Sequence, residues 1–166
     1  RTGLETEAVG LLHSDKVGAE ALGGAPGETV ETCLRRRLAA GDRDFLVAPF
    51  FLGPSRGVTN WLPSALEEWR KEFSDLRVKV APCLAGEGEG EDVLAEAVAD
   101  RVRDCMREAG SVRPFVAFVD HGSPAREVFE VRERVGELTR CKLGDEVLGL
   151  RTCSMERRPG EAYAFN

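Results

Sequence analysis

The sequence predicts an α/β fold with a mainly parallel sheet. Short apolar runs alternate along the chain with longer segments in which apolar residues recur every three or four positions, the pattern of strands joined by helices. One run, FLVAPFFL at residues 45–52, is apolar throughout, which is typical of a strand covered on both faces. The 166 residues are enough for one ordinary core.

The first half of the chain alternates between strands and helices. Apolar residues that share one face indicate a helix. Val30, Cys33, Leu34 and Leu38 do so, and Gly41 ends this segment. In order, we expect a strand at 8–12, a helix at 28–41, a strand at 45–52, a helix at 61–73 and a strand at 76–85.

The second half continues the alternation. We expect a helix at 92–110, a strand at 114–120, a helix at 125–138 and a strand at 146–153. The first of these helices carries an apolar stripe that we interpret as core and not as a cofactor site, because helical spacing of apolar residues is the ordinary sign of packing. The stripe consists of Leu94, Ala97, Val98, Val102, Cys105 and Met106.

Composition excludes several classes of protein. The formal net charge of −6 argues against a nucleic-acid partner, and no stretch approaches the roughly 20 apolar residues of a membrane span. The five cysteines are widely spaced and form no CxxC pair, which argues against a zinc knuckle or a redox motif. Reduced cysteines indicate a protein that is not secreted, and plastid stroma and cytoplasm both fit.

Unusual polar residues follow the expected strands. The loops are HSDK at 13–16, GPSRG at 53–57, HGSP at 121–124 and SMERRPG at 154–160. Right-handed crossovers place the carboxyl ends of parallel strands along one edge of a sheet, where ligands of open α/β sheets bind. Both histidines of the chain fall on this edge. The sequence therefore predicts a binding site there.

The chemistry of these loops has more than one interpretation. His13 and His121 could bind a divalent metal, act as general bases or serve as hydrogen-bonded structural groups. Ser123 is first of all expected to cap a helix, with Pro124 at its first position. The amides of Gly122 and Ser123 could also hold a carboxylate. Ser123 is not expected to be a hydrolase nucleophile, because the G-x-S-x-G elbow is absent.

The charged loop residues have two interpretations. Arg56, Glu156, Arg157 and Arg158 fit solvated loop charge, which is the default for such residues. Arginine also suits carboxylate ligands, because its guanidinium donates paired hydrogen bonds.

Three stretches together resemble the CbiX/SirB family of sirohydrochlorin chelatases: FLVAPFFLGPSRGVTNWLP, FVAFVDHGSP and MERRPGEAYAFN. These relatives of the class II chelatases insert cobalt or iron into a tetrapyrrole without ATP, in siroheme or cobalamin synthesis. The resemblance implies a flavodoxin-like, chelatase-like three-layer sandwich, often present as two tandem units with the active site between them. It further implies a divalent metal as substrate, no tightly bound cofactor, a tetrapyrrole partner, no membrane partner, and compatibility with a homo-oligomer.

The resemblance also implies roles for individual residues. His121 matches the histidine of the family's HGS motif, and His13 matches a second histidine of some members; both would hold the metal or accept protons. Glu156 could assist as a carboxylate base. The implied substrate-binding residues are Ser55, Arg56, Gly122, Ser123, Arg126, Arg157 and Arg158.

The resemblance divides the chain into two repeats and suggests a fragment. Residues 1–110 resemble a first unit without its opening strand and helix, and residues 111–166 resemble the opening of a second unit. Ser154 then stands where His13 stands in the first unit, and Gly57 follows Arg56 where the family often has another histidine. These departures favour the alternative of a non-catalytic domain that binds a tetrapyrrole or a metal, or is a structural subunit. A flavodoxin-type FMN protein is a weaker alternative, because no Ser/Thr-rich phosphate loop follows the first strand.

Overall fold

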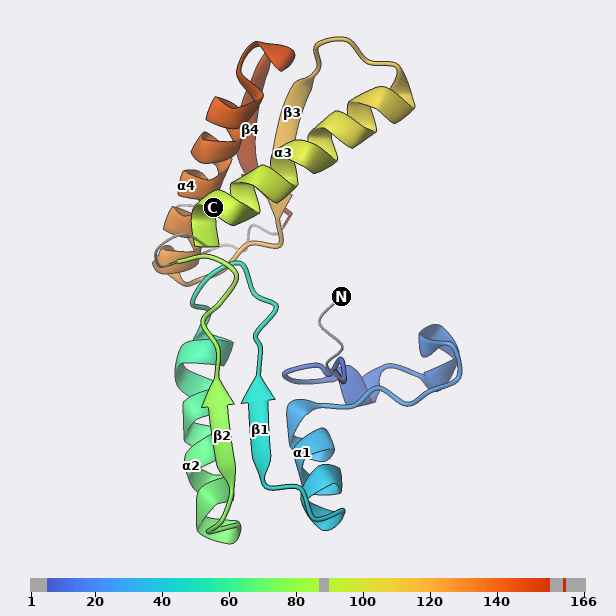
Figure 1. Ribbon diagram of the computed structural model, residues 1–166, viewed down its shortest axis with the longest axis vertical. Helices are drawn as coiled ribbons and strands as arrows, with labels where there is room; N and C mark the ends of the chain where they lie inside the picture. The colour runs from blue at the N-terminus through green and yellow to red at the C-terminus, as the bar shows by residue number, and fades with distance from the viewer. Residues whose placement is uncertain (1–5, 87–89, 156–159, 161–166) are drawn as a thin grey trace. The chain divides into compact units, whose positions relative to one another are not determined.

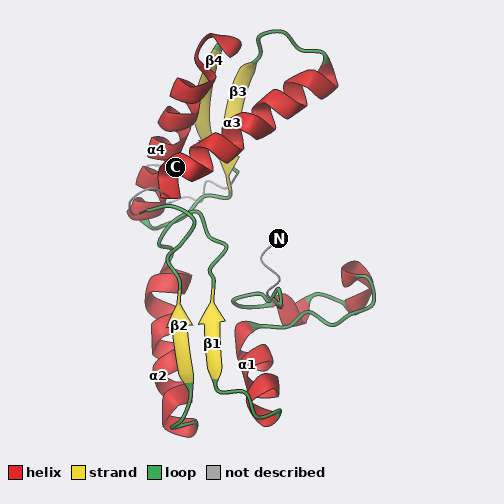
Figure 2. Ribbon diagram, viewed as in Figure 1, coloured by secondary structure: helices red, strands yellow, loops and turns green. Residues whose placement is uncertain are grey.

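The computed structural model describes residues 6–86, 90–155 and 160, and has a mixed α/β composition. Helices and strands alternate, as the sequence predicts (Figures 1 and 2). The elements are α1 (Val30–Ala39), β1 (Asp44–Val47), α2 (Leu62–Glu72), β2 (Arg77–Val80), α3 (Gly90–Ala109), β3 (Phe115–Asp120), α4 (Arg126–Leu143) and β4 (Gly149–Ser154). None of the helices in the described ranges is long and apolar enough to cross a membrane.

The strands form two short parallel pairs. β1 lies beside β2, and the two arrows run in the same direction in Figure 1. β3 pairs with β4 in parallel, from Phe115 opposite Gly149 to Asp120 opposite Ser154. The expected parallel pairing is confirmed, and each pair has its carboxyl ends at one edge.

The chain forms two compact units. One contains Arg1–Phe45 and Glu68–Val78, and the other contains Leu46–Glu67 and Lys79–Asn166. We call them unit 1 and unit 2. The division of the sequence at residue 110 into two repeats stays a prediction.

In unit 1, α1 forms where the sequence predicts a helix. Its start is capped by two threonines: the Thr29 hydroxyl accepts the Thr32 amide at 3.2 Å, and the Thr32 hydroxyl accepts the Thr29 amide at 2.9 Å. The predicted apolar face is buried at Val30, Leu34 and Leu38.

In unit 2, α3 and α4 build the core with β3 and β4. One cluster joins Ala95 of α3 to Val131 and Val135 of α4, and a second joins Ala99 to Leu143. α4 lies very close to β4 at Gly136, where a Cβ atom would be only 2.4 Å from Cγ2 of Thr152. A glycine is needed at this position because any larger residue would push the helix off the strand.

The strand expected at 8–12 is wrong. The chain makes only a single parallel bridge there, between Gly10 and Thr29, and Leu12 is exposed. Gly10 exchanges backbone hydrogen bonds with Glu28 and Val30, at 2.9 and 2.8 Å. The next residues bend away into a short 3-10 turn, so the pairing cannot extend.

The strand expected at 45–52 is shorter than predicted, and only one of its two faces is partly covered. β1 ends at Val47, two residues before Pro49, which has no amide N–H to continue the ladder. Pro82 follows β2 in the same way. Leu46 is 67 % exposed and Phe50 is 88 % exposed.

The apolar stripe of α3 is only partly buried. Ala95 and Ala99 are enclosed, whereas Ala97 and Cys105, which we expected to face inward, are exposed. Among the described strands, β3 pairs only with β4, so part of this helix face has no strand across from it.

Candidate functional site

The loops that follow β1 and β2 remain joined beyond the strands. In unit 2, the amide of Leu84 donates to the carbonyl of Phe51, and the amide of Ala85 donates to the carbonyl of Leu52, both at 2.9 Å. Leu52 and Ala85 then pack in the same core cluster as Val131 of α4. These contacts bring both loops to the helix that follows the HGSP loop.

The GPSRG loop rests directly on α4. Gly53 is buried, and a Cβ atom there would lie 3.2 Å from Cγ2 of Val131 and 3.6 Å from Cα of Val128. Pro54 lies over Gly86, with its Cδ atom 3.4 Å from the position of a Cβ. The GPSRG loop therefore lies against the first half of α4, the helix that follows the HGSP loop, within unit 2.

The HGSP loop has a defined hydrogen-bonded shape. The carboxylate of Asp120 accepts the amide of Gly122 at 3.0 Å, which closes a turn around the exposed His121. Gly122 has a φ of 92°, a conformation that favours glycine. Because its amide is bonded to Asp120, it is not available for the carboxylate ligand suggested by the sequence.

The capping role expected for Ser123 is wrong. α4 begins at Arg126, and its N-cap is Ala125, which has an extended backbone. Ser123 and Pro124 therefore precede the helix. The Ser123 hydroxyl instead accepts the Ala125 amide at 3.1 Å and stabilises the turn before the helix.

A buried arginine lies behind this loop and was missed by the sequence reasoning. Arg132 of α4 is 2 % exposed, and its guanidinium donates to Asp120 Oδ1 at 3.1 Å and also to the hydroxyl of Ser154. Its Nε atom donates to Glu133 at 3.2 Å, and the guanidinium lies 4.9 Å from the ring centre of Phe129. The sequence did contain a sign of this network: an arginine lies within the apolar stripe of a helix, and a buried charge requires partners.

Among the remaining site residues of unit 2, both arginines of the described ranges are exposed, Ser55 has a buried hydroxyl, and the others lie outside the described residues. Arg56 is exposed, and Arg126 is exposed and paired with Glu130 at 3.0 Å. The Ser55 hydroxyl is buried and has no hydrogen-bond partner in the described part of the chain. Glu156, Arg157 and Arg158 fall outside the described residues.

His13 belongs to unit 1 and lies in a turn. It is exposed, and its φ of 66° is the one left-handed conformation of a residue other than glycine in the ranges the structure describes. Its carbonyl accepts the Lys16 amide at 3.1 Å and opens the 3-10 turn Ser14–Lys16. The two histidines are thus presented by turns of different units.

Unit 1 also contains a cluster with the chemistry of metal ligands. The ligand atoms of Glu7, Glu28 and Cys33 lie within 4.8 Å of one another. Arg36 donates to both carboxylates, and Arg37 lies 3.5 Å from Glu7, so two arginines balance the two negative charges. Burial and the hydrogen bond to Glu7 raise the pKa of the Cys33 thiol to about 11, so a thiolate is not available at neutral pH. We interpret this cluster as a surface ion-pair network.

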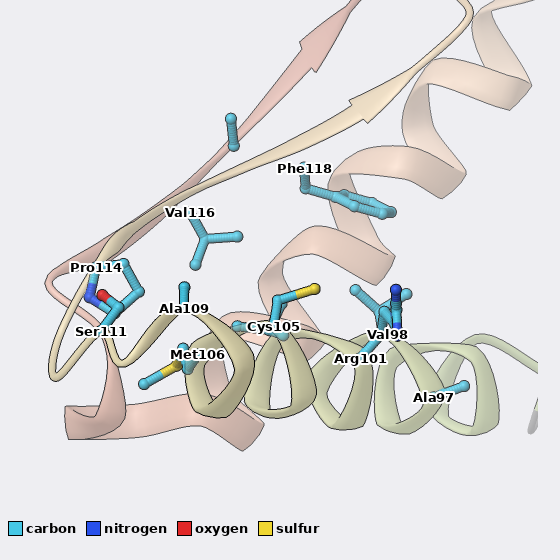
Figure 3. A pocket seen from close by; sticks show the side chains of 12 residues that line it. Ala97, Val98, Arg101, Cys105, Met106, Ala109, Ser111, Pro114, Val116 and Phe118 are labelled. Carbon is cyan, nitrogen blue, oxygen red and sulfur yellow. The ribbon is translucent and has the colours of Figure 1, made fainter.

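A hollow in unit 2 is lined by residues outside these loops. It is an apolar groove of about 580 Å³ between α3 and β3 (Figure 3). Its walls include Cys105 and Met106 of the α3 stripe and, on the other side, Val116 and Phe118 of β3. None of the predicted site residues in the described ranges lines it.

Comparison with known proteins gives one match. The model of the CbiX family matches residues 19–105, which is just over half of the chain. The match includes the GPSRG loop with Ser55 and Arg56. It covers neither His13 nor His121. Searches of curated proteins and of solved structures gave no match.

Proposed function

The chain belongs to the CbiX family, and on this basis we propose that it is a chelatase that inserts a divalent metal, cobalt or iron, into sirohydrochlorin without ATP. The observation that carries the proposal is the packing of the GPSRG loop, part of the matched segment, against α4, the helix that begins at the HGSP loop. A loop that is distant in the sequence thereby rests on the helix that follows the HGSP loop. The proposal includes a reducing compartment, plastid stroma or cytoplasm.

We propose that the parallel pairs belong to flavodoxin-like, three-layer units related by tandem repeat, with residues 1–110 in the first and 111–166 in the second. The alternation of helices with parallel strands supports this assignment. In such folds the loops at the carboxyl ends of the strands bind ligands.

Metal insertion makes two chemical demands on the protein. The hydrated metal must lose water ligands, and the macrocycle must lose two pyrrole protons. A neutral imidazole can meet either demand, as a metal ligand or as a proton acceptor. His121 is exposed at the end of β3, and in the described part of the chain no hydrogen bond occupies its imidazole. We assign it this role, and we assign the same type of role to His13 in unit 1.

The substrate presents many carboxylates, which arginine recognises through paired hydrogen bonds. Arg56 is an exposed residue of the GPSRG loop, which rests on α4. Within the described residues Arg126 has one ion pair, an exposed one with Glu130, and such pairs contribute little and exchange readily for a ligand. We propose both as substrate-binding residues with Ser55 and Ser123. Gly122 is left out of this set, because its amide is bonded to Asp120. On the resemblance alone, we also propose Glu156 as a carboxylate base and Arg157 and Arg158 as substrate-binding residues.

The test is anaerobic spectrophotometry of sirohydrochlorin with cobalt(II) or iron(II). We expect the metallated absorption bands to grow faster with the wild-type protein than without it. His121→Ala should abolish the acceleration, and Glu127→Gln, an exposed change on the first turn of α4, should keep it. Equal rates with and without wild-type protein would refute the proposal.

A second candidate is a non-catalytic domain that binds the tetrapyrrole. It is favoured by Ser154, which stands where the resemblance would place a histidine in the second repeat. The Ser154 hydroxyl is bonded to Arg132 in the described structure. A stoichiometric complex that keeps the spectrum of the metal-free tetrapyrrole in the presence of cobalt(II) would identify this function.

A further inference from the structure

The buried network around Arg132 has no role in the proposed function so far. Its guanidinium bonds with the last residues of both strands of unit 2: with Asp120 of β3 at 3.1 Å and with Ser154 of β4. These two residues are direct partners in the β3–β4 register. One side chain of α4 therefore fixes the carboxyl ends of two neighbouring strands.

The same network determines the shape of the turn that holds His121. Oδ1 of Asp120 accepts both the Arg132 guanidinium and the Gly122 amide, at 3.1 and 3.0 Å. His121 is the residue between the two ends of this turn. Any rotation of the Asp120 side chain would break the bond to Gly122, so Arg132 holds the backbone of His121 through Asp120.

The loop after β4 is fixed in the same place. The amide of Met155 donates to the carbonyl of Asp120 at 2.8 Å. The Thr152 hydroxyl donates at 2.6 Å to Glu133, whose carboxylate also accepts from Arg132. The network thus spans α4, β3 and β4 at the edge where the candidate site lies.

Stability alone does not account for this arrangement. Arg132 is 2 % exposed and the Asp120 side chain is 14 % exposed, so both charges have lost most of their water. Replacing a buried ion pair by apolar residues of similar volume is often neutral or stabilising. Arg132 is surrounded on its helix by the buried Val128, Val131 and Val135, where an apolar residue would pack equally well.

We propose that Arg132, Asp120 and Ser154 are positioning residues that hold His121 in the orientation needed for metal insertion. This inference rests on the proposed function of His121. Residues that orient a metal-binding side chain from behind commonly contribute about 10- to 100-fold to activity. The expected signature is therefore a loss in kcat with little change in KM.

The experiment compares variants of the full chain in the anaerobic insertion assay. Asp120→Ala removes the acceptor of Gly122 and should lower kcat about 10- to 100-fold, with KM within about threefold. Asp120→Asn keeps an acceptor oxygen and should restore kcat to within about threefold of wild type, because the bond to Gly122 can still form. Equal losses in both variants, or no loss in either, would overturn the inference.

Two further variants keep the test decisive if Asp120→Ala does not fold. Asp120→Leu combined with Arg132→Met removes both charges, and we expect it to fold but to lose kcat by the same factor. Ser154→Ala is the mildest change, because it removes one acceptor of the Arg132 guanidinium and leaves the bond to Asp120, and it should lower kcat roughly threefold. Wild-type kcat in a folded double variant or in Ser154→Ala would contradict the positioning role.

His121→Ala separates the two hypotheses. If it abolishes insertion while the Asp120 and Arg132 variants keep wild-type kcat, only the positioning inference fails. If it inserts metal at the wild-type rate, or the wild-type chain is inactive, the proposed function fails. In that case the NMR order parameter of the Gly122 amide still tests the network: it should fall from about 0.85 to below about 0.6 in Asp120→Ala, and an unchanged value would show that Asp120 does not hold the turn.

Discussion

The contact between α4 and β4 gives a sharp test of the fold. A Cβ atom at Gly136 would lie 2.4 Å from Cγ2 of Thr152, whereas ordinary carbon contacts begin at 3.4 Å. Gly136→Ala therefore requires helix and strand to separate by about 1 Å. Overpacking of this kind costs about 1–3 kcal/mol, and the better helix propensity of alanine returns about 1 kcal/mol.

The expected net effect is a loss of up to about 2 kcal/mol, or a fall in Tm of up to about 8 °C for a chain of this size. Thermal unfolding followed by circular dichroism measures it. Thr152→Ser removes the opposing methyl group but keeps the hydroxyl that donates to Glu133, so it should rescue Gly136→Ala in the double variant. A Gly136→Ala protein more stable than wild type, or a double variant no more stable than Gly136→Ala, would refute the packing described here.

Three other predictions concern single side chains. Ser55→Ala should leave Tm unchanged or raise it, because the buried Ser55 hydroxyl has no hydrogen-bond partner in the described structure. A Tm lower by several degrees would contradict this prediction. Cys33 should react with iodoacetamide at pH 8 more slowly than the exposed Cys105, because burial and Glu7 raise the Cys33 pKa to about 11. The Cys33 thiol of the unfolded chain loses its proton near its ordinary pKa of 9.0, whereas the thiol of the folded chain loses it only near 11. This thiol should therefore lower the free energy of unfolding as pH rises from 9 to 11. Cys33→Ser should weaken that pH dependence. Arg56→Ala should raise KM for sirohydrochlorin with little change in kcat, as expected for a residue that binds a substrate carboxylate, and an unchanged KM would exclude this role.

The helices could be predicted from the sequence because their burial depends on local spacing. Val30, Leu34 and Leu38 recur at helical intervals and are buried in α1. The strands were harder, because their length depends on partners elsewhere in the chain. The apolar character of residues 45–52 does not show where strand pairing stops. Pro49 is the one signal in this run, because proline has no amide N–H to donate to the neighbouring strand.

Prediction of the candidate site was also limited by contacts between residues that are distant in the sequence. The position of His121 at the end of a strand followed from the order of the elements. The shape of its turn did not, because it depends on Asp120 meeting Arg132, which is twelve residues away, and Ser154 on another strand. Ser123 was expected to cap α4 because serine is a favoured capping residue, yet the extended backbone of Ala125 delays the helix to Arg126.

The central claim is that His121 takes part in metal insertion, and the most direct measurement is the anaerobic rate of insertion of cobalt(II) or iron(II) into sirohydrochlorin. Our account predicts acceleration by the wild-type protein, its loss in His121→Ala and its retention in Glu127→Gln. Insertion by His121→Ala at the wild-type rate would contradict the account.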